Sequence, residues 1–293
     1  MKYRIEKDSL GEVKVPQNAL WGPQTQRALD NFTISGIKFA FPFGRSFIEA
    51  LGIIKYSAAV TNQKLKLLSA KKAAPIKAAS KEVAKGLYDE SFPLDVFQTG
   101  SGTSTNMNAN EVIANVASKA SKLSIDANDD VNMSQSSNDV IPTAICISAL
   151  IDMERSLLPN LDILIKAIDV KMVSLKGKVK TGRTHLMDAM PIEFSQELSG
   201  WKAQLESCKT SLINSTNRMN ELPQGGTAIG TGINCHKDFS KNFCTEVNKV
   251  AKLNTKPAKN FFQGLSSVDN AIELSSALKN LSIVLMKISN DLR

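Results

Sequence analysis

Apolar positions recur at alternating three- and four-residue spacing along three long stretches in the second half of the chain. The first stripe is Leu157, Leu161, Leu164 and Ile168, the second is Phe194, Leu198, Trp201, Leu205, Cys208 and Leu212, and the third is Leu274, Leu278, Leu281, Leu285, Ile288 and Leu292. This spacing places one apolar stripe along each helix, so it predicts three long helices that bundle with one another. Partner chains would cover any stripe that remains exposed.

The first 45 residues lack sustained helical periodicity. Residues 3–15 predict a short hairpin around Gly11, and a helical pattern begins near Ser46 and then dominates. The predicted fold class is mainly α, with a small mixed N-terminal domain followed by a long helical bundle.

We expect the domains to cover residues 1–135 and 136–293, with the boundary before a helix that Asn138 or Asp139 could cap. The third stripe is still in register at Leu292, one residue before the sequence stops. We therefore expect the bundle to be incomplete in this chain.

Composition places the chain among ordinary globular proteins, with 293 residues of which 42% are hydrophobic and 22% are charged. No uncharged apolar run approaches the length of a membrane-spanning helix, and the charged N-terminus does not resemble a signal peptide. A cytoplasmic location is the expectation.

The net charge of +8 would attract anions. Five lysines between residues 71 and 85 contribute to this charge. The segment lacks the arginine and aromatic residues with which proteins contact and stack on nucleic-acid bases. We expect a solvated helix face and no nucleic-acid partner. The four cysteines form no C-x-x-C pair and the chain has two histidines, so we expect no metal site.

Three polar segments interrupt the helical rhythm: residues 98–110, 129–143 and 180–191. Each precedes or opens a helical stretch. Hydroxyls, amides and free N–H groups at helix N-termini can bind an anion. The alternative is that these residues only cap helices.

Two residues near these segments could move protons. Histidine is the side chain that ordinarily moves protons near neutral pH, and His185 is the histidine within a polar segment, although a lone histidine is often structural. Glu111 follows the first polar segment and could instead be a solvent-facing charge. Residue chemistry alone predicts an acid–base site for a small anion. The glycine-rich stretches at residues 100–105 and 225–232 lack the features of nucleotide-binding loops.

Five segments carry a resemblance to a known family: Gly100–Ile113 (GSGTSTNMNANEVI), Ser134–Asp139 (SQSSND), Gly182–Asp188 (GRTHLMD), Leu198–Trp201 (LSGW) and Gly225–Asn234 (GGTAIGTGIN). With them the chain resembles the class II fumarases of the fumarase/aspartase superfamily. The resemblance implies reversible hydration of fumarate to (S)-malate in the tricarboxylic acid cycle, without cofactor or metal.

The resemblance also implies roles for individual residues. One carboxylate of the dicarboxylate substrate would be held by Ser101, Gly102, Thr103 and Asn106, with Ser136, Ser137 and Asn138 around it. Thr184 would orient the substrate, and His185 would donate and accept the proton. The family's sites combine segments from three subunits of a homotetramer with a shared helical bundle.

Within the superfamily, Thr184-His185 and Ser136-Ser137-Asn138 favour fumarase, and an aspartase-type ammonia lyase is the alternative. The family's mobile loop, which carries the carbon-acid base, would follow the third stripe and is not reached before Arg293. We therefore expect little or no hydratase activity from residues 1–293 alone. A non-catalytic or split subunit that needs a partner chain is a further possibility.

The family also has an accessory anion site that typically reads His-Pro-Asn-Asp. Here the corresponding residues are Asp126, Ala127, Asn128 and Asp129. An aspartate in the place of the histidine argues against anion binding there.

Overall fold

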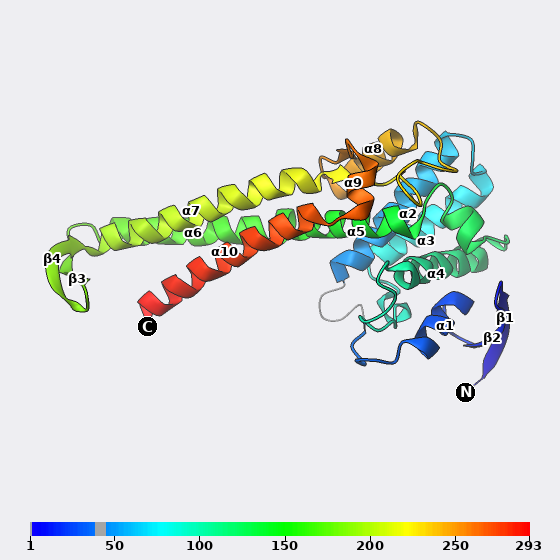
Figure 1. The fold of residues 1–293 in the computed structure, drawn as a ribbon, viewed down its shortest axis with the longest axis horizontal. Coiled ribbons are helices and arrows are strands. Elements are labelled where there is room, and N and C mark those ends of the chain that lie inside the picture. Colours follow the sequence, from blue (N-terminus) through cyan, green and yellow to red (C-terminus); the bar gives the residue numbers. More distant parts are fainter. Residues whose placement is uncertain (1, 39–44) are drawn as a thin grey trace. The chain divides into compact units, whose positions relative to one another are not determined.

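The structure is a computed structural model that describes residues 2–38 and 45–293 (Figure 1). Its contacts divide the chain into two compact units, each described here by itself. The first unit comprises Met1–Leu150 and Asn220–Val268, and the second comprises Ile151–Met219 and Asp269–Arg293. These bounds differ from the predicted division at residue 135.

The first unit opens with the hairpin that the sequence predicts. Strands β1 (Tyr3–Asp8) and β2 (Gly11–Pro16) pair antiparallel, with Asp8 opposite Gly11 across a two-residue turn. Helix α1 (Pro23–Asn31) follows.

The core of this unit is built from α2 (Arg45–Lys64), α3 (Ala70–Ala84) and α4 (Thr103–Ser121). Helix α2 packs on α3, and α3 packs on α4. Gly52 permits a close approach, because a Cβ there would lie 2.6 Å from the backbone nitrogen of Ala84. Helix α8 (Phe239–Ala251) returns to pack on α2, which is why residues 220–268 belong to this unit.

Further elements complete the first unit. They are η1 (Asp89–Ser91), η2 (Ala127–Val131), α5 (Ser137–Asp152), the parallel pair β5 (Glu221–Leu222) and β6 (Lys256–Pro257), and α9 (Phe261–Ser266). The last residues of α5 lead into the second unit through η3 (Met153–Leu157).

The second unit is a long helical assembly with a hairpin at one end (Figure 1). Its elements are α6 (Leu158–Ser174), β3 (Val179–Thr184), β4 (Met187–Glu193), α7 (Phe194–Met219) and α10 (Asp269–Leu292). Helix α7 packs on both α6 and α10. The mainly α fold that the apolar spacing predicts is therefore confirmed.

The predicted stripes are buried to different extents. In α7 the stripe from Leu198 to Leu212 is buried, while Phe194 at its start is 38% exposed. In α6, Leu161 and Ile168 are buried.

The stripe predicted for α10 lies on a helix, as expected, and this chain buries only part of it. Its buried line is Leu274, Ala277, Leu281, Val284 and Ile288. The other predicted members, Leu278, Leu285 and Leu292, are exposed. The reason is that α10 packs on α7 through one line of residues, and the described part of the chain leaves the adjacent flank uncovered.

In the part of the chain that the structure describes, no helix combines the length and apolar character needed to cross a membrane.

Candidate functional site

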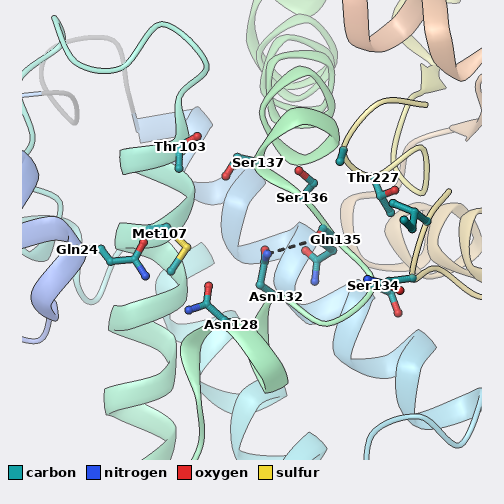
Figure 2. Close-up of a pocket in the computed structure, with 13 residues that line it drawn as sticks. Gln24, Thr103, Met107, Asn128, Asn132, Ser134, Gln135, Ser136, Ser137 and Thr227 are labelled. Carbon is teal, nitrogen blue, oxygen red and sulfur yellow. Dashed lines mark hydrogen bonds between the residues drawn. The ribbon is translucent and has the colours of Figure 1, made fainter. Parts of the chain in front are cut away.

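Two of the polar segments meet in a pocket of about 430 Å³ within the first unit (Figure 2). The pocket is lined by Gln24, Thr103, Met107, Asn128, Asn132, Ser134, Gln135, Ser136, Ser137, Thr227, Ala228, Ile233 and Asn234. None of the described residues in this lining carries a charge. Donors and acceptors are therefore amides, hydroxyls and backbone groups, which suits a ligand that brings its own charge.

The N-terminus of α4 forms one side of the pocket. Gly102 immediately precedes the helix with a φ of 70°, and a Cβ there would lie 2.8 Å from the Ile141 side chain. Glycine is therefore needed for both conformation and space. Thr103 opens the helix and lines the pocket, and its hydroxyl lies 3.0 Å from that of Ser101.

The N-terminus of α5 forms a second side and is held by a capping box. The Ser136 hydroxyl accepts from the backbone N–H of Asn138 at 3.2 Å, and Asp139 accepts from the backbone N–H of Ser136 at 2.9 Å. The cap is therefore Ser136, and the expectation that Asn138 or Asp139 caps the helix was wrong. Ser136 therefore caps a helix and also lines the pocket.

Asp139 also joins α5 to the glycine-rich segment. Its second carboxylate oxygen accepts from the backbone N–H groups of Gly225 and Thr227, both at 2.9 Å. Burial raises the pKa of Asp139, and these hydrogen bonds together with the charge of Lys55 oppose the rise. A buried carboxylate thus holds two segments that are distant in sequence against the same pocket.

Residues 227–234 also line the pocket in part, a role that their sequence did not predict. Thr227 has a φ of 56°, a conformation that β-branched residues rarely adopt. Its hydroxyl is buried at the pocket and has no hydrogen-bond partner among the described residues. Asn138 donates to the backbone oxygen of Ala228 at 2.6 Å. The resemblance quoted this segment, but nothing in its composition places it beside residues 134–137.

Lys55 is a second residue near the pocket whose role was not predicted from the sequence. It lies on α2, is fully buried, and its ammonium donates to Asn106, Asn132 and Gln135 at 2.8, 2.9 and 3.0 Å. Burial lowers the pKa of Lys55 to about 7, against the opposing effect of Asp139. A lysine inside the apolar run of α2 was the available signal.

Glu111 is buried, so the alternative of a solvent-facing charge was wrong. Its carboxylate accepts from the backbone N–H groups of Gly22, Gln24 and Thr25 and from the Thr25 hydroxyl, at 2.6–3.1 Å. It therefore caps α1 from a neighbouring helix. Burial raises the pKa of Glu111, and the four hydrogen bonds oppose that rise. Through this cap Glu111 positions the segment that carries Gln24 to the pocket.

Thr184 and His185 belong to the second unit and are not among the residues that line this pocket. Thr184 pairs with Met187, which leaves His185 and Leu186 as a two-residue turn with φ values of 52° and 61°. Such turns favour asparagine and glycine, because positive φ is costly for other residues. The His185 side chain is exposed in this chain, so the candidate proton donor lies on a solvent-exposed turn with a strained backbone.

The residues of the expected accessory site form a closed local arrangement. The Asp126 carboxylate accepts from the backbone N–H groups of Asn128 and Asp129 at 2.7 and 2.8 Å and so caps η2, which begins at Ala127. An anion would compete with Asp126 for these two donors. Among residues 2–38 and 45–293, no group of three or more potential metal ligands comes together.

Comparison with known proteins identifies the family to which this fold belongs. A family model described as Lyase matches residues 11–293, and the chain belongs to this lyase family. Within that family, it is similar to the class II fumarate hydratase of Xylella fastidiosa strain Temecula1, with 51% identity over 292 residues. It is also 45% identical to the class II fumarate hydratase of Bacillus subtilis over 298 residues.

These alignments cover all of this chain but 61% and 64% of the two relatives, respectively, so the chain spans less than two thirds of their length. Among solved structures, the recombinant class II fumarase of Schistosoma mansoni matches with a TM-score of 0.93 and 37% identity, over 99% of this chain and 64% of the other. A fumarate lyase:delta crystallin of Brucella melitensis bound to cobalt matches with a TM-score of 0.94 and 38% identity, over 100% and 64%. The resemblance to class II fumarases is therefore confirmed.

Proposed function

We propose that this chain forms part of a fumarate hydratase, which adds water reversibly to fumarate and yields (S)-malate in the tricarboxylic acid cycle. The observation that carries the proposal is the uncharged pocket into which residues from the N-terminal ends of α4 and α5 converge. Free backbone donors and the helix dipoles favour a carboxylate at such a place. The similarity to class II fumarate hydratases selects this dicarboxylate among small anions.

In this proposal Thr103, Ser136 and Ser137 offer hydroxyls to one substrate carboxylate. Three neighbours support them: Asn106 donates to Ser137 at 2.9 Å, Ser101 contacts Thr103, and Asn138 binds the loop at Ala228. Gly102 supplies the left-handed turn that opens α4.

The chemistry requires removal of a proton from the carbon beside a carboxylate, which builds an aci-carboxylate with two negative charges. Donors that are already oriented before the reaction stabilise this developing charge. In the proposal Thr184 orients the substrate, and His185 acts as proton donor and acceptor for the water, whereas the base for the carbon proton lies on the loop that would follow the third stripe. The proposal includes no cofactor.

The complete site would arise in a homotetramer, in which Thr184 and His185 of one subunit reach the pocket of another. Two features support this assembly. On the hairpin, Leu186 is 97% exposed and Met190 is 78% exposed, and on α10 the flank with Ile283 and Met286 is 50–60% exposed. Apolar surfaces of this kind mark contacts with other chains. We place the protein in the cytoplasm.

The test is proton NMR of fumarate and malate with protein purified from its source, which retains any further residues or subunits. Recombinant residues 1–293 are measured in parallel. We expect saturable fumarate binding by both preparations and formation of (S)-malate by the source protein. Release of ammonia from aspartate without malate formation would replace the proposal with an ammonia lyase, and absence of fumarate binding would reject both.

A further inference from the structure

A buried cation lies behind the uncharged pocket. The Lys55 ammonium donates to side-chain oxygens of Asn106, Asn132 and Gln135, and the last two of these residues line the pocket. Lys55 itself has no exposed surface. A charge in this position acts on the pocket with little screening by solvent.

The ammonium also determines which way the amides face. It carries three donors and no acceptor, so each amide must turn its oxygen towards Lys55. The Asn106 oxygen accepts at 2.8 Å, and its NH₂ group therefore faces the other way, where it donates to the Ser137 hydroxyl at 2.9 Å. The orientation of Asn106 thus follows from the charge of Lys55.

Ser137 lies at the pocket wall (Figure 2) and completes the chain of hydrogen bonds that begins at Lys55. Its oxygen accepts from Asn106, which uses one lone pair and leaves the hydroxyl proton for another acceptor. Hydrogen bonds in series polarise one another, so a donor at the end of a chain that begins at a cation is strengthened.

We propose that Lys55 is a positioning residue that supplies positive charge for carboxylate binding in this pocket and orients the Ser137 hydroxyl through Asn106. The inference rests on the proposed function, because fumarate is the source of the carboxylate. It assigns the charge balance of the site to a residue that the ligand does not touch.

The protonation of Lys55 and the binding of an anion are then coupled. The groups that contact its ammonium are neutral amides from α4 and from residues 132–135, and Asp139 of α5 is the charged group that acts on it. Burial lowers the pKa of Lys55 to about 7. A dicarboxylate in the pocket stabilises the ammonium and raises this pKa, and by linkage affinity falls as pH rises.

The first experiment follows the Lys55 titration by NMR in chain labelled with ¹³C at the lysine Cε, with the signal assigned by its loss in Lys55→Met. We expect a lysine that titrates near neutral pH and whose pKa rises by about one unit or more with saturating fumarate. Fumaramide, which is uncharged, should leave the titration unchanged. The titration itself is followed in the unmodified chain, and Lys55→Met serves only to assign the signal.

The second experiment measures fumarate affinity against pH by calorimetry. If binding requires charged Lys55, the wild-type affinity should fall up to about 30-fold from pH 6 to 8.5, following the charged fraction. Lys55→Met should bind at least about tenfold more weakly at pH 6 and show a flat profile. Lys64→Met is the matched control, because Lys64 lies on the same helix with an exposed ammonium.

The outcomes separate the two proposals. Equal fumarate affinity in Lys55→Met, or an unchanged wild-type Lys55 pKa with bound fumarate, overturns the role of Lys55 and leaves the proposed function standing. If inorganic phosphate raises the pKa of Lys55 and fumarate does not bind, Lys55 still supplies the charge of an anion site, but fumarate is not its ligand. No effect of either anion overturns the inference.

Discussion

The two compact units carry their candidate chemistry in opposite ways. In the first unit, buried charged side chains position the elements that form the pocket. Lys55 donates to three amides, Asp139 joins α5 to residues 225–227, and Glu111 caps α1. In the second unit, His185 lies on an exposed turn with positive φ, and no such network supports it among the residues that the structure describes. In the proposed function, the binding residues therefore come from the first unit of one chain, and His185 would reach a pocket through assembly with other copies.

Both units contain a two-residue hairpin turn, so the backbone conformations of the two turns can be compared directly. In the first unit Ser9 and Leu10 connect Asp8 to Gly11, and the positive φ falls on the glycine. In the second unit the positive φ values fall on His185 and Leu186. The strained turn is the one that carries the candidate proton donor, a pattern typical of functional sites.

The largest expected effect is on catalysis, from His185→Asn in the active assembly. Asparagine tolerates positive φ, so the turn should persist while the proton chemistry is lost. We expect the rate of fumarate hydration to fall by about 10²–10⁴-fold, as is usual for a general acid or base. His236→Asn, on a loop of the first unit, is the control. A loss of less than about tenfold would remove His185 from the mechanism.

The next effect breaks the network of the first unit. Asp139→Ala leaves the buried N–H groups of Ser136, Gly225 and Thr227 without their acceptor, and we expect a loss of about 3 kcal/mol in the free energy of unfolding. Trp21 and Trp201 lie in different units, so urea unfolding in single-tryptophan backgrounds reports each unit separately. The loss should appear in the Trp21 signal.

Asp162→Ala removes an exposed carboxylate that pairs with Lys209 and should change the free energy of unfolding by less than about 0.5 kcal/mol. Equal losses in both tryptophan signals after Asp139→Ala would show that the two units unfold together and that the comparison does not extend to stability.

A smaller effect is a pH dependence of stability that belongs to Lys55. Its folded pKa of about 7 lies below the ordinary value of 10.5, so the unfolded chain binds more protons between these values. Stability from this group therefore rises with pH across that window, by up to about 1.4 kcal/mol per pH unit. Burial raises the pKa of Cys235 and Cys244 to about 12, which acts in the opposite direction above the ordinary thiol pKa.

The difference between wild type and Lys55→Met isolates the lysine contribution, because the thiols are common to both. We expect this difference in the free energy of unfolding, followed at Trp21 from pH 7 to 9, to increase in favour of wild type. A difference that stays constant with pH would show that Lys55 is charged in the folded state throughout this range.

The apolar spacing was sufficient to predict the helices and much of their packing. It predicted the buried line of α7 because that helix is covered on two sides by α6 and α10. It did not predict that Leu278 and Leu285 of α10 are exposed in this chain, since periodicity gives the apolar face of a helix and not the number of neighbours that cover it.

The candidate site was predictable in its chemistry and not in its assembly. The polar composition of residues 98–110 and 129–143 pointed to the ends of α4 and α5. The buried partners were missed because each contact joins residues far apart in the chain, such as Lys55 with Gln135 or Asp139 with Gly225. The turn at His185 gave no signal, since its sequence lacks the glycine or asparagine that marks such turns.

The smallest effect concerns the strained turn itself. Leu186→Gly removes the cost of a positive φ at a side chain that is 97% exposed in this chain, so we expect the second unit to become about 1 kcal/mol more stable in the Trp201 signal. Leu10→Gly is the matched change in the other hairpin. Leu10 has no positive φ, so glycine there should be neutral or slightly destabilising.

If the exposed Leu186 is also an assembly contact, the same Leu186→Gly chain should associate more weakly by light scattering despite its greater stability. A variant that is more stable and associates equally well would show that Leu186 adds backbone strain to the turn and makes no contact with other chains. The strain of the hairpin would then serve only the placement of His185.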